Sequence, residues 1–535
     1  MTVLSSRARG LRRVADEHLP RDTPPSGGAD AQLSSAARGG ALNLFGSIIT
    51  AIAQFGFVLL VTRSLGATGS GSLLIALAIF QIVGRSAELG VATGLIRWIT
   101  HSRVRGRVPE IRAVLPAALG PALGIGAVFG LALWLGAARL ADSFQAAGTP
   151  DGALAEQLRL LAPFVPVLAL YSAMVNGCRG FATMRPTVVI DRIAKPVLQP
   201  LLVGGLLLLG VSSRWLVVGW AAPIVLLVAP ATIWFAHLLR RSERGASSAP
   251  LDRVERPGSL LRREFWSFTL PRSFSGIFQI SITWFDTILV GAIASAAAAG
   301  IYSAAIRYLM VGTFVVLAIG QSVQPLVSEA FARSDLNSAR ELFQMSASWV
   351  VMSLLPIYTL VAIFAPTLLA VFGPEFVDAV PALVILASAT ALAAPGGPAA
   401  TILLMGGRSL LSSLNMGLSL AANVGLNLVL IPAYGITGAA LAFAVSIVVG
   451  KILPVLQVYF TMGLHPFGFA TLRVMVLALG VFGGIGGALR LAFGGGLPTL
   501  LVTTIVATGC YGILLVRQKE RLGLDVVLSI YRPRR

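Results

Sequence analysis

The chain has 535 residues, of which 56% are hydrophobic and only 12% are charged, and its formal net charge is +19 at pH 7. Soluble domains usually carry about 25% charged residues, so this composition excludes an ordinary soluble protein and indicates a membrane protein. The cationic residues are spread over many loops rather than gathered on one face, which argues against nucleic-acid binding.

Residues 1–40 are basic and lack an apolar core, which predicts a disordered cytoplasmic tail rather than a signal peptide. About fourteen apolar stretches follow, each near the roughly 20 residues that a membrane-spanning helix needs. They are long and do not alternate with polar residues, so helices rather than strands are predicted. The stretches lie near 41–62, 70–96, 113–137, 157–177, 187–210, 215–239, 266–292, 300–327, 344–372, 379–405, 410–431, 436–460, 472–492 and 497–516.

Arginine and lysine mark every second loop of this pattern. They are frequent in the N-terminal tail, in 97–112, in 240–263 and in the C-terminal tail, whereas the intervening loops are short or poor in cations. The positive-inside rule therefore predicts a multi-pass protein of the cell membrane with both termini in the cytoplasm.

An internal repeat relates the two halves of the chain. An offset of 229 residues places Gly71 on Gly300 and Arg179 on Arg408. Each unit contains six apolar stretches, an even number, so the units are predicted to be parallel repeats about an axis along the membrane normal. The predicted parts are a cytoplasmic tail 1–40, a six-helix unit 41–240, a cytoplasmic linker 241–264, a second six-helix unit 265–463, an extra helix pair 464–517 and a basic cytoplasmic tail 518–535.

Two equivalent stretches carry a polar stripe with helical spacing. In 266–292 the stripe is Arg272, Ser275, Gln279, Thr283 and Asp286. In 41–62 it is Asn43, Ser47, Thr50 and Gln54. Residues three or four apart share one face of a helix, and in lipid a polar face must contact protein or water. We therefore predict that both stripes face the interface between the two halves.

Asp286 is the unusual member of these stripes, because an ionised side chain near the centre of a membrane helix costs roughly 2.5–3.5 kcal/mol. Asp286 lies about ten residues before the predicted hairpin turn and Arg307 about ten after it, so both lie roughly 15 Å below the turn. This predicts that Asp286 faces a polar cavity beside Arg307. A purely structural ion pair that locks the hairpin is the alternative, and the two interpretations are compatible.

The charges predicted to lie within the membrane are mostly cationic. Arg85 and Glu88 lie three residues apart and can pair with each other, which is the alternative to a role of Arg85 in a cavity. The remaining charges of this kind are Arg159, Arg272, Asp286, Arg307 and Lys451. A surplus of guanidinium groups favours an anionic substrate, and phosphate in particular.

The sequence offers little for catalysis or for a cofactor. Cys178 and Cys510 are far apart in the sequence and indicate neither a disulfide framework nor a metal site. The four histidines lack zinc-site spacing, and no phosphate-binding glycine loop or nucleophile with its base is recognisable. We therefore expect a protein without a cofactor or metal, and not an enzyme.

Three segments resemble the oligosaccharide and polysaccharide flippases of the multidrug/oligosaccharidyl-lipid/polysaccharide exporter superfamily, over roughly 41–463. The segments are "SLGATGSGSLLIALAIFQIVGRSAELGVATGLIRWI", "DTILVGAIASAAAAGIYSAAIRYL" and "FGPEFVDAVPALVILASAT". Asp286 followed by Gly300-x-Tyr302-x-x-Ala305-x-Arg307 is the most specific part. The first hairpin departs from the family pattern. It reads Thr68-Gly69-Ser70-Gly71, whereas the family usually has an aromatic residue before its glycine.

The resemblance implies two six-helix bundles in a V around a central cavity, with the extra helix pair appended. It implies that alternating access of the bundles moves a polyprenyl-pyrophosphate-linked oligosaccharide from the inner to the outer leaflet for cell-surface polysaccharide biosynthesis. The expected partners are this lipid-linked glycan, membrane lipids and polysaccharide polymerase machinery. The predicted substrate-binding residues are Asn43, Thr50, Gln54, Arg85, Arg272, Gln279, Thr283, Asp286 and Arg307.

Three alternatives stay open at this stage. A peptidoglycan lipid-precursor flippase has the same helix plan but usually carries charges in its first helix, where this chain has a neutral stripe. A cation-coupled multidrug exporter of the same superfamily would have a more acidic or aromatic cavity. A membrane-embedded glycan polymerase would have a large outer loop, which the sequence does not show.

Overall fold

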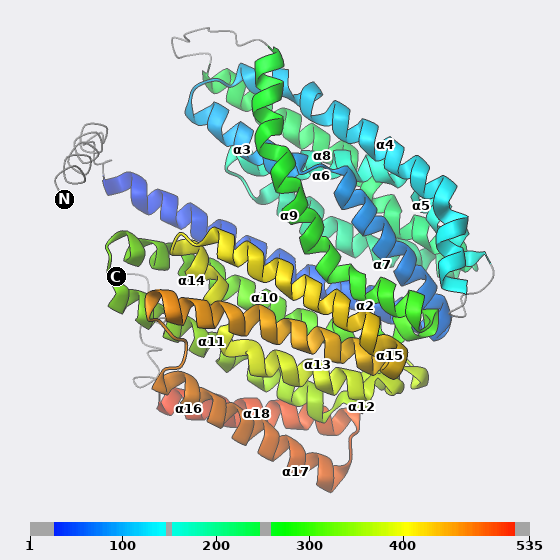
Figure 1. The fold of residues 1–535 in the computed structure, drawn as a ribbon, viewed down its shortest axis with the longest axis vertical. Coiled ribbons are helices and arrows are strands. Elements are labelled where there is room, and N and C mark those ends of the chain that lie inside the picture. The colour runs from blue at the N-terminus through cyan, green and yellow to red at the C-terminus, as the bar shows by residue number, and fades with distance from the viewer. Residues whose placement is uncertain (1–25, 146–151, 247–257, 519–535) are drawn as a thin grey trace, which may run out of the picture.

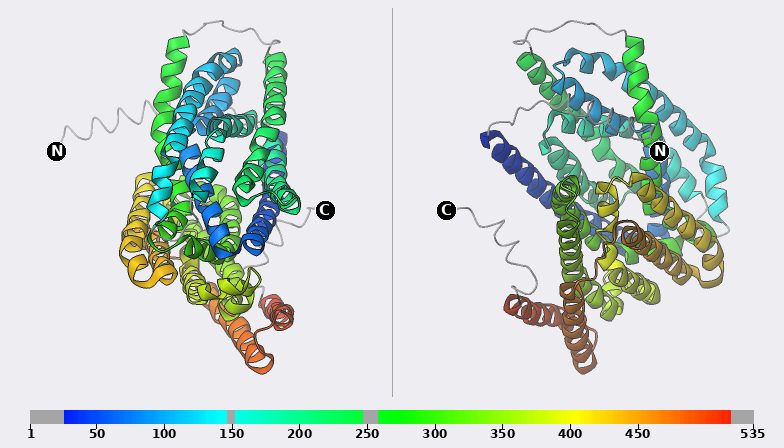
Figure 2. Two further views of the ribbon diagram at one scale, coloured as in Figure 1. Left: turned by 90° about the vertical axis from the view of Figure 1, so that its right-hand side faces the viewer. Right: turned by 60° about the vertical axis from the view of Figure 1, so that its left-hand side comes forward.

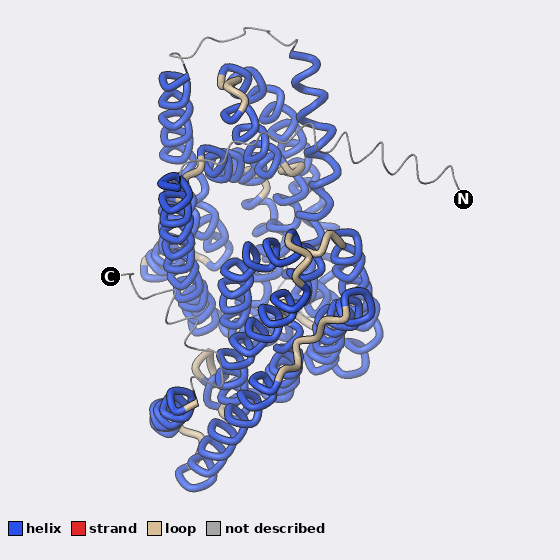
Figure 3. The backbone as a smooth tube through the Cα atoms, turned by 90° about the vertical axis from the view of Figure 1, so that its left-hand side faces the viewer, coloured by secondary structure: helices blue, strands red, loops and turns tan. Residues whose placement is uncertain are grey.

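The computed structural model describes residues 26–145, 152–246 and 258–518. These residues form helices joined by short turns, and they contain no strand (Figure 3). The predictions for 1–25, for 247–257 in the linker and for the tail 519–535 lie outside the described residues. The all-helical fold class predicted from the sequence is therefore confirmed for the described part of the chain.

Three sets of helices follow one another along the chain (Figure 1). The first helix group consists of α2 (Ser26–Ala87), α3 (Val91–Val104), α4 (Pro109–Gln145), α5 (Ala153–Leu161), α6 (Phe164–Gly177), η1 (Cys178–Phe181), η2 (Thr187–Ala194), α7 (Lys195–Leu208), η3 (Ser213–Trp215) and α8 (Leu216–Ala246). The second helix group consists of α9 (Gly258–Ile293), α10 (Ala296–Ala332), α11 (Leu336–Ile363), α12 (Ala365–Ala370), η4 (Pro374–Ala379), α13 (Val380–Ala393), η5 (Ala394–Gly396), α14 (Ala399–Met405) and α15 (Ser409–Met462). The C-terminal helices are α16 (Phe469–Ala478), η6 (Leu479–Gly483), α17 (Gly484–Phe493) and α18 (Leu497–Arg517).

Within the described residues, nine helical runs are long and apolar enough to cross a membrane, or ten if the bent pair α5 and α6 is one span. Two of these runs have 60 and 53 residues, far more than the roughly 20 that a bilayer needs. Helix α2 of the first run contains the non-helical Gly66 with φ 67°, and α15 contains Gly435 with φ 55°; the first run is interrupted again at Gly90, with φ 73°, before α3. Glycine adopts positive φ without steric cost, so Gly66 and Gly435 each divide a long helix into two. The chain is a multi-span membrane protein, and fourteen crossings, in two six-helix bundles and an extra helix pair, stay a prediction.

The backbone follows the 229-residue repeat closely. The offset places Gly66 on Ser295, which caps the N-terminus of α10, and it places Gly177, where α6 ends, on Gly406, directly after α14. The chain therefore breaks its helices at equivalent positions in the two halves.

The two halves meet where α2 and α10 cross, at Gly71 and Gly300. A Cβ atom on Gly71 would lie 1.7 Å from the carbonyl oxygen of Ala296, and one on Gly300 would lie 2.4 Å from that of Ala67. Ala67 and Ala296 are themselves related by the same offset. The contact is therefore reciprocal, as a two-fold relation between the halves requires, and it depends on glycine at both positions.

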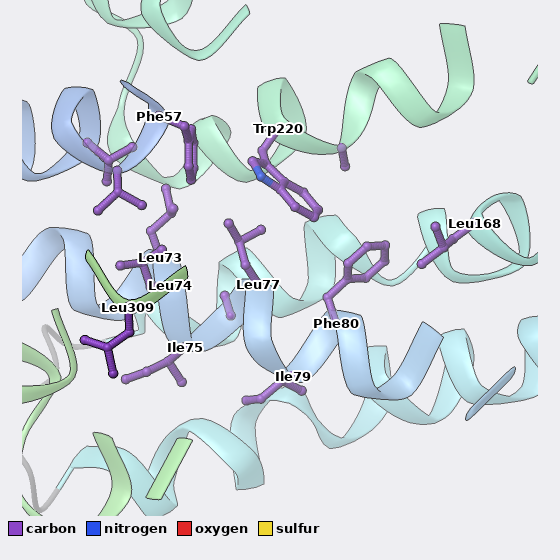
Figure 4. Close-up of a cluster of buried hydrophobic side chains, with 14 of the residues drawn as sticks. Phe57, Leu73, Leu74, Ile75, Leu77, Ile79, Phe80, Leu168, Trp220 and Leu309 are labelled. Carbon is purple, nitrogen blue, oxygen red and sulfur yellow. The ribbon is translucent and has the colours of Figure 1, made fainter. Parts of the chain in front are cut away.

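The helices of each group pack mainly on one another, whereas α2 and α9 contact helices of both groups (Figure 1). Figure 4 shows part of the first core, where the rings of Phe80 and Trp220 stand edge to face with centroids 6.1 Å apart. Leu309 of α10 reaches the same cluster, so the core continues into the second helix group. The C-terminal helices pack along α11 at the edge of the molecule (Figure 2).

Candidate functional site

The ends of helices from the two groups are linked by a pair of hydrogen-bonding side chains. Arg63 Nε donates to the carbonyl oxygen of Val371 at 2.7 Å, and the backbone N–H of Ala67 donates to Glu375 Oε2 at 3.2 Å. Each side chain thus satisfies backbone groups that a helix end leaves unpaired. With the orientation predicted from the sequence, these links and the Gly71–Gly300 crossing lie at the outer end of the molecule.

Arg85 and Glu88 form the ion pair that was one of the two alternatives for them. Arg85 Nη1 lies 2.6 Å from Glu88 Oε2, and the Glu88 side chain is buried whereas that of Arg85 is 43% exposed. The pair therefore satisfies the carboxylate and leaves much of the guanidinium accessible. A role of Arg85 in substrate binding is compatible with this geometry and stays a prediction.

A set of charges that the sequence analysis missed lies beside this pair, on η2 and the start of α7. Lys195 forms an ion pair with Asp191, and the hydroxyl of Tyr171 donates to Asp191 Oδ1 at 3.1 Å. The Lys195 ammonium group also lies 5.2 Å from the centre of the Tyr171 ring. Segment η2 is a π-helix. This conformation is rare in proteins, and where it occurs it is often at a functional site. The signal in the sequence was "IDRIAK", which places three charges within one turn of an apolar stretch.

Together these residues form a basic cluster in the first helix group. Its members are Arg85, Glu88, Arg179, Asp191, Arg192 and Lys195. The charges on α2 lie close enough to those on η2 and α7 to interact electrostatically. Four cations face two carboxylates, so the cluster carries a surplus of positive charge. Arg179 is exposed and lies in η1, the turn that follows α6.

Two residues of the polar stripe on α2, Ser47 and Thr50, contact this cluster. The hydroxyl of Thr50 donates to the carbonyl oxygen of Arg192 at 2.7 Å, and Arg192 Nη1 lies 3.5 Å from Ser47 Oγ. Asn43 and Gln54 are half-buried. The prediction that this stripe faces the interface between the halves is therefore wrong for Thr50, because a carbonyl group of its own helix group satisfies its hydroxyl.

The stripe on α9 is described only in part. The side chains of Arg272 and Gln279 lie outside the described residues, so their predicted roles stay untested. Thr283 is exposed and Asp286 is buried. The structure therefore tests the predicted role of this stripe only through the surroundings of Asp286.

Asp286 lies in a neutral hydrogen-bond network of the second helix group. Asn427 Nδ2 donates to Asp286 Oδ1 at 2.9 Å, and the hydroxyl of Tyr302 lies 3.3 Å from Asp286 Oδ2. Asn427 Nδ2 also donates to Asn423 Oδ1 at 3.2 Å, so its two N–H groups have one acceptor each. The two asparagines are four residues apart on one face of α15, a spacing in an apolar stretch that could have revealed them.

Asp286 and Arg307 form no ion pair, so the alternative of a pair that locks the hairpin is wrong. Arg307 instead lies 5.8 Å from the centre of the Trp284 ring, and its Nη1 is 3.9 Å from the sulfur of Met310. Its buried Nε has no partner among the described residues. Tyr302 takes the place beside Asp286, and five residues of α-helix turn Arg307 about 140° away from Tyr302. Equal depth in the membrane was therefore not enough to predict an ion pair, because Arg307 and Tyr302 point to different sides of α10 and Tyr302 is the one that faces Asp286.

The fold is shared with transporters of the MOP superfamily. The structure titled Lipid II flippase MurJ, inward closed conformation, matches with a TM-score of 0.68 and 10% identity over 89% of this chain and 98% of that chain. An inward-facing multidrug resistance MATE family transporter of the MOP superfamily matches with a TM-score of 0.62 and 14% identity over 78% of this chain and 95% of that chain. At these identities the likeness concerns the fold alone.

The family model described as "Polysaccharide biosynthesis protein" matches residues 36–331, more than half of the sequence, and the chain belongs to this family. Two proteins of Haloferax volcanii are similar to it. The "Probable low-salt glycan biosynthesis flippase Agl15" is 24% identical over 208 residues, which are 37% of this chain and 43% of that protein. The "Probable flippase AglR" is 27% identical over 182 residues, 33% of this chain and 38% of that protein. The matched region thus spans less than half the length of either relative.

Proposed function

We propose that this protein is a flippase, rather than an enzyme, that moves a polyprenyl-pyrophosphate-linked oligosaccharide from the inner to the outer leaflet for cell-surface polysaccharide biosynthesis. The observation that carries the proposal is the basic cluster, with its surplus of cations on membrane helices. The family match and the glycan biosynthesis flippase among the relatives support the same substrate class. The proposed location is the cell membrane with both termini in the cytoplasm.

The exposure of the cluster argues for a polar space in front of it. A charged side chain that faces lipid near the bilayer centre costs roughly 2.5–3.5 kcal/mol, so the accessible group of Arg85 should face water or substrate. Guanidinium groups bind phosphate through two parallel hydrogen bonds, and pyrophosphate offers several acceptor oxygens. We therefore assign the cluster to the pyrophosphate of the substrate.

Transport by alternating access requires the two helix groups to separate at the outer end. The Gly71–Gly300 crossing and the links of Arg63 and Glu375 join the two groups at the end that the predicted orientation makes the outer one. These contacts connect the groups without a covalent bond, and they are the ones that must part in an outward-open state. Polysaccharide polymerase machinery remains a proposed partner for the delivered glycan.

Transport in proteoliposomes with a fluorescent prenyl-pyrophosphate-linked oligosaccharide tests this proposal. Arg179→Gln and Arg192→Gln should each lower the rate about 10- to 150-fold, the equivalent of one charge-assisted hydrogen bond. Arg192→Lys should restore only part of the rate, because an ammonium group lacks the guanidinium fork. Arg159→Gln, which removes a cation on α5 outside the cluster, is the matched control.

Two results would contradict the proposal. Wild-type transport by both glutamine variants at equal protein levels would remove the basic cluster from the mechanism. Transport of the lipid-linked peptidoglycan precursor, or of a cationic drug, in preference to the oligosaccharide would favour one of the other functions considered for this superfamily.

A further inference from the structure

A groove runs between α4 of the first helix group and α9 of the second. The two helices are joined by a hydrogen bond from Trp266 Nε1 to the carbonyl oxygen of Ala117, 3.0 Å long. Beside this bond lies a groove of about 880 Å³, with an apolar lining that includes Pro121, Ile125 and Leu270. A groove of this kind fits a hydrocarbon chain better than a polar ligand.

Two arginines give the groove a polar end. Arg262 and Arg263 line it and are exposed, and within the described residues neither guanidinium has a hydrogen-bond or ion-pair partner. They belong to the cation-rich region that the positive-inside rule places at the cytoplasmic surface. The inner leaflet carries anionic headgroups, which attract such residues by about 1 kcal/mol for each cation. Charge and apolar lining together match a molecule with an anionic head and a hydrocarbon tail.

Helix α9 presents one stripe of side chains to this groove and a neighbouring stripe to α3. Arg262, Trp266 and Leu270 recur every four residues and line the groove, whereas Phe265 and Thr269 form a neighbouring stripe against α3. That second contact is tight, since a Cβ atom on Gly94 would lie 2.3 Å from Thr269 Oγ1. Leu89, which directly follows Glu88 of the basic cluster, also lines the groove, so the tail of a substrate is the alternative occupant that an experiment must exclude.

We propose that the groove is a binding site for an anionic phospholipid of the inner leaflet. Its phosphate binds Arg262 and Arg263, and one acyl chain lies along Trp266 and Leu270. Because α4 and α9 belong to different helix groups, a lipid bound there holds the two groups together at this end. The site thus links the lipid composition of the membrane to the conformation seen in the structure.

Native mass spectrometry of the detergent-purified full chain, titrated with phosphatidylglycerol, tests the proposal. The double variant Arg262→Gln/Arg263→Gln should bind the tightest-bound lipid about 30-fold more weakly, the loss expected for two interfacial cations. The matched control Arg240→Gln/Arg241→Gln removes two cations of α8 that do not line the groove, and it should bind as wild type does. Leu270→Trp fills the groove without changing its charge and should weaken binding as well.

Competition with other molecules in the same titration identifies what occupies the groove. Phosphatidylcholine and chain-free glycerophosphoglycerol should both fail to compete, because the first lacks the net negative charge and the second lacks the chain. Unchanged binding by the double variant, or an equal loss in its control, would overturn the proposal. Displacement of phosphatidylglycerol by an equal concentration of a prenyl phosphate would also overturn it and assign the groove to substrate. No transport is measured, so the outcome is independent of the proposed function.

Discussion

Gly71→Ala is the sharpest perturbation that the structure offers, because the added Cβ atom would meet backbone. It would lie 1.7 Å from the carbonyl oxygen of Ala296 and 2.6 Å from the carbonyl carbon. Backbone atoms cannot rotate away as a side chain can, so α2 and α10 must separate. Overpacking in a well-packed core typically costs 1–3 kcal/mol, and this contact should lie at about 2–3 kcal/mol. The conformation described here should therefore lose about 30- to 150-fold in population relative to states in which the crossing is open.

Distance measurements between spin labels can detect this shift. Ser64 and Asp378 are exposed and lie next to the Arg63 and Glu375 links. Cysteines at these two positions, in a chain that carries Cys510→Ala, should report a longer distance in the Gly71→Ala protein than in its parent. Gly56→Ala is the matched control in the same helix, because a Cβ atom there would meet nothing within 4 Å. Equal distance distributions for parent, control and Gly71→Ala would refute the assignment of this crossing as the outer seal.

Three further outcomes follow from the polar contacts. A double-mutant cycle with Asp286→Asn and Arg307→Gln should give a coupling energy below about 0.5 kcal/mol in unfolding experiments, as expected for residues that share no contact. A coupling energy above about 1 kcal/mol would show that the two side chains do form an ion pair. Asp191→Ala should destabilise the protein by about 2 kcal/mol, and adding Lys195→Ala should recover part of this loss, since a partly buried cation is no longer left alone. Glu375→Gln should increase labelling of a cysteine at Ser64 from the outside, and unchanged labelling would show that this carboxylate does not hold the outer end closed.

The sequence predicted features that depend on one helix or on the repeat. The 229-residue offset aligned Gly71 with Gly300, and the structure brings these two residues into reciprocal contact. The spacing of Arg85 and Glu88 was sufficient for their ion pair, because both lie on the same helix face. Periodicity and composition contain this information directly.

The partners of buried polar groups on different helices could not be predicted in the same way. Sequence position fixes the depth of Asp286, but its partners depend on how α9, α10 and α15 are rotated about their axes. That rotation selects Tyr302 and Asn427 and turns Arg307 aside. Likewise, Thr50 belongs to a regular stripe, yet the π-helical turn of η2 supplies a carbonyl group that no propensity rule would place there.

The links at the outer end also have a consequence for water. Arg63 donates to the carbonyl oxygens of Val371 and Ala370, and Glu375 accepts from the N–H of Ala67. Both charged side chains are already exposed, but when the two helix groups separate the backbone groups they pair with must bind water instead, because unpaired polar groups are costly. Opening therefore takes up water, and its equilibrium should respond to osmotic stress. Solutes that are excluded from the protein surface should keep the outer end shut even without substrate.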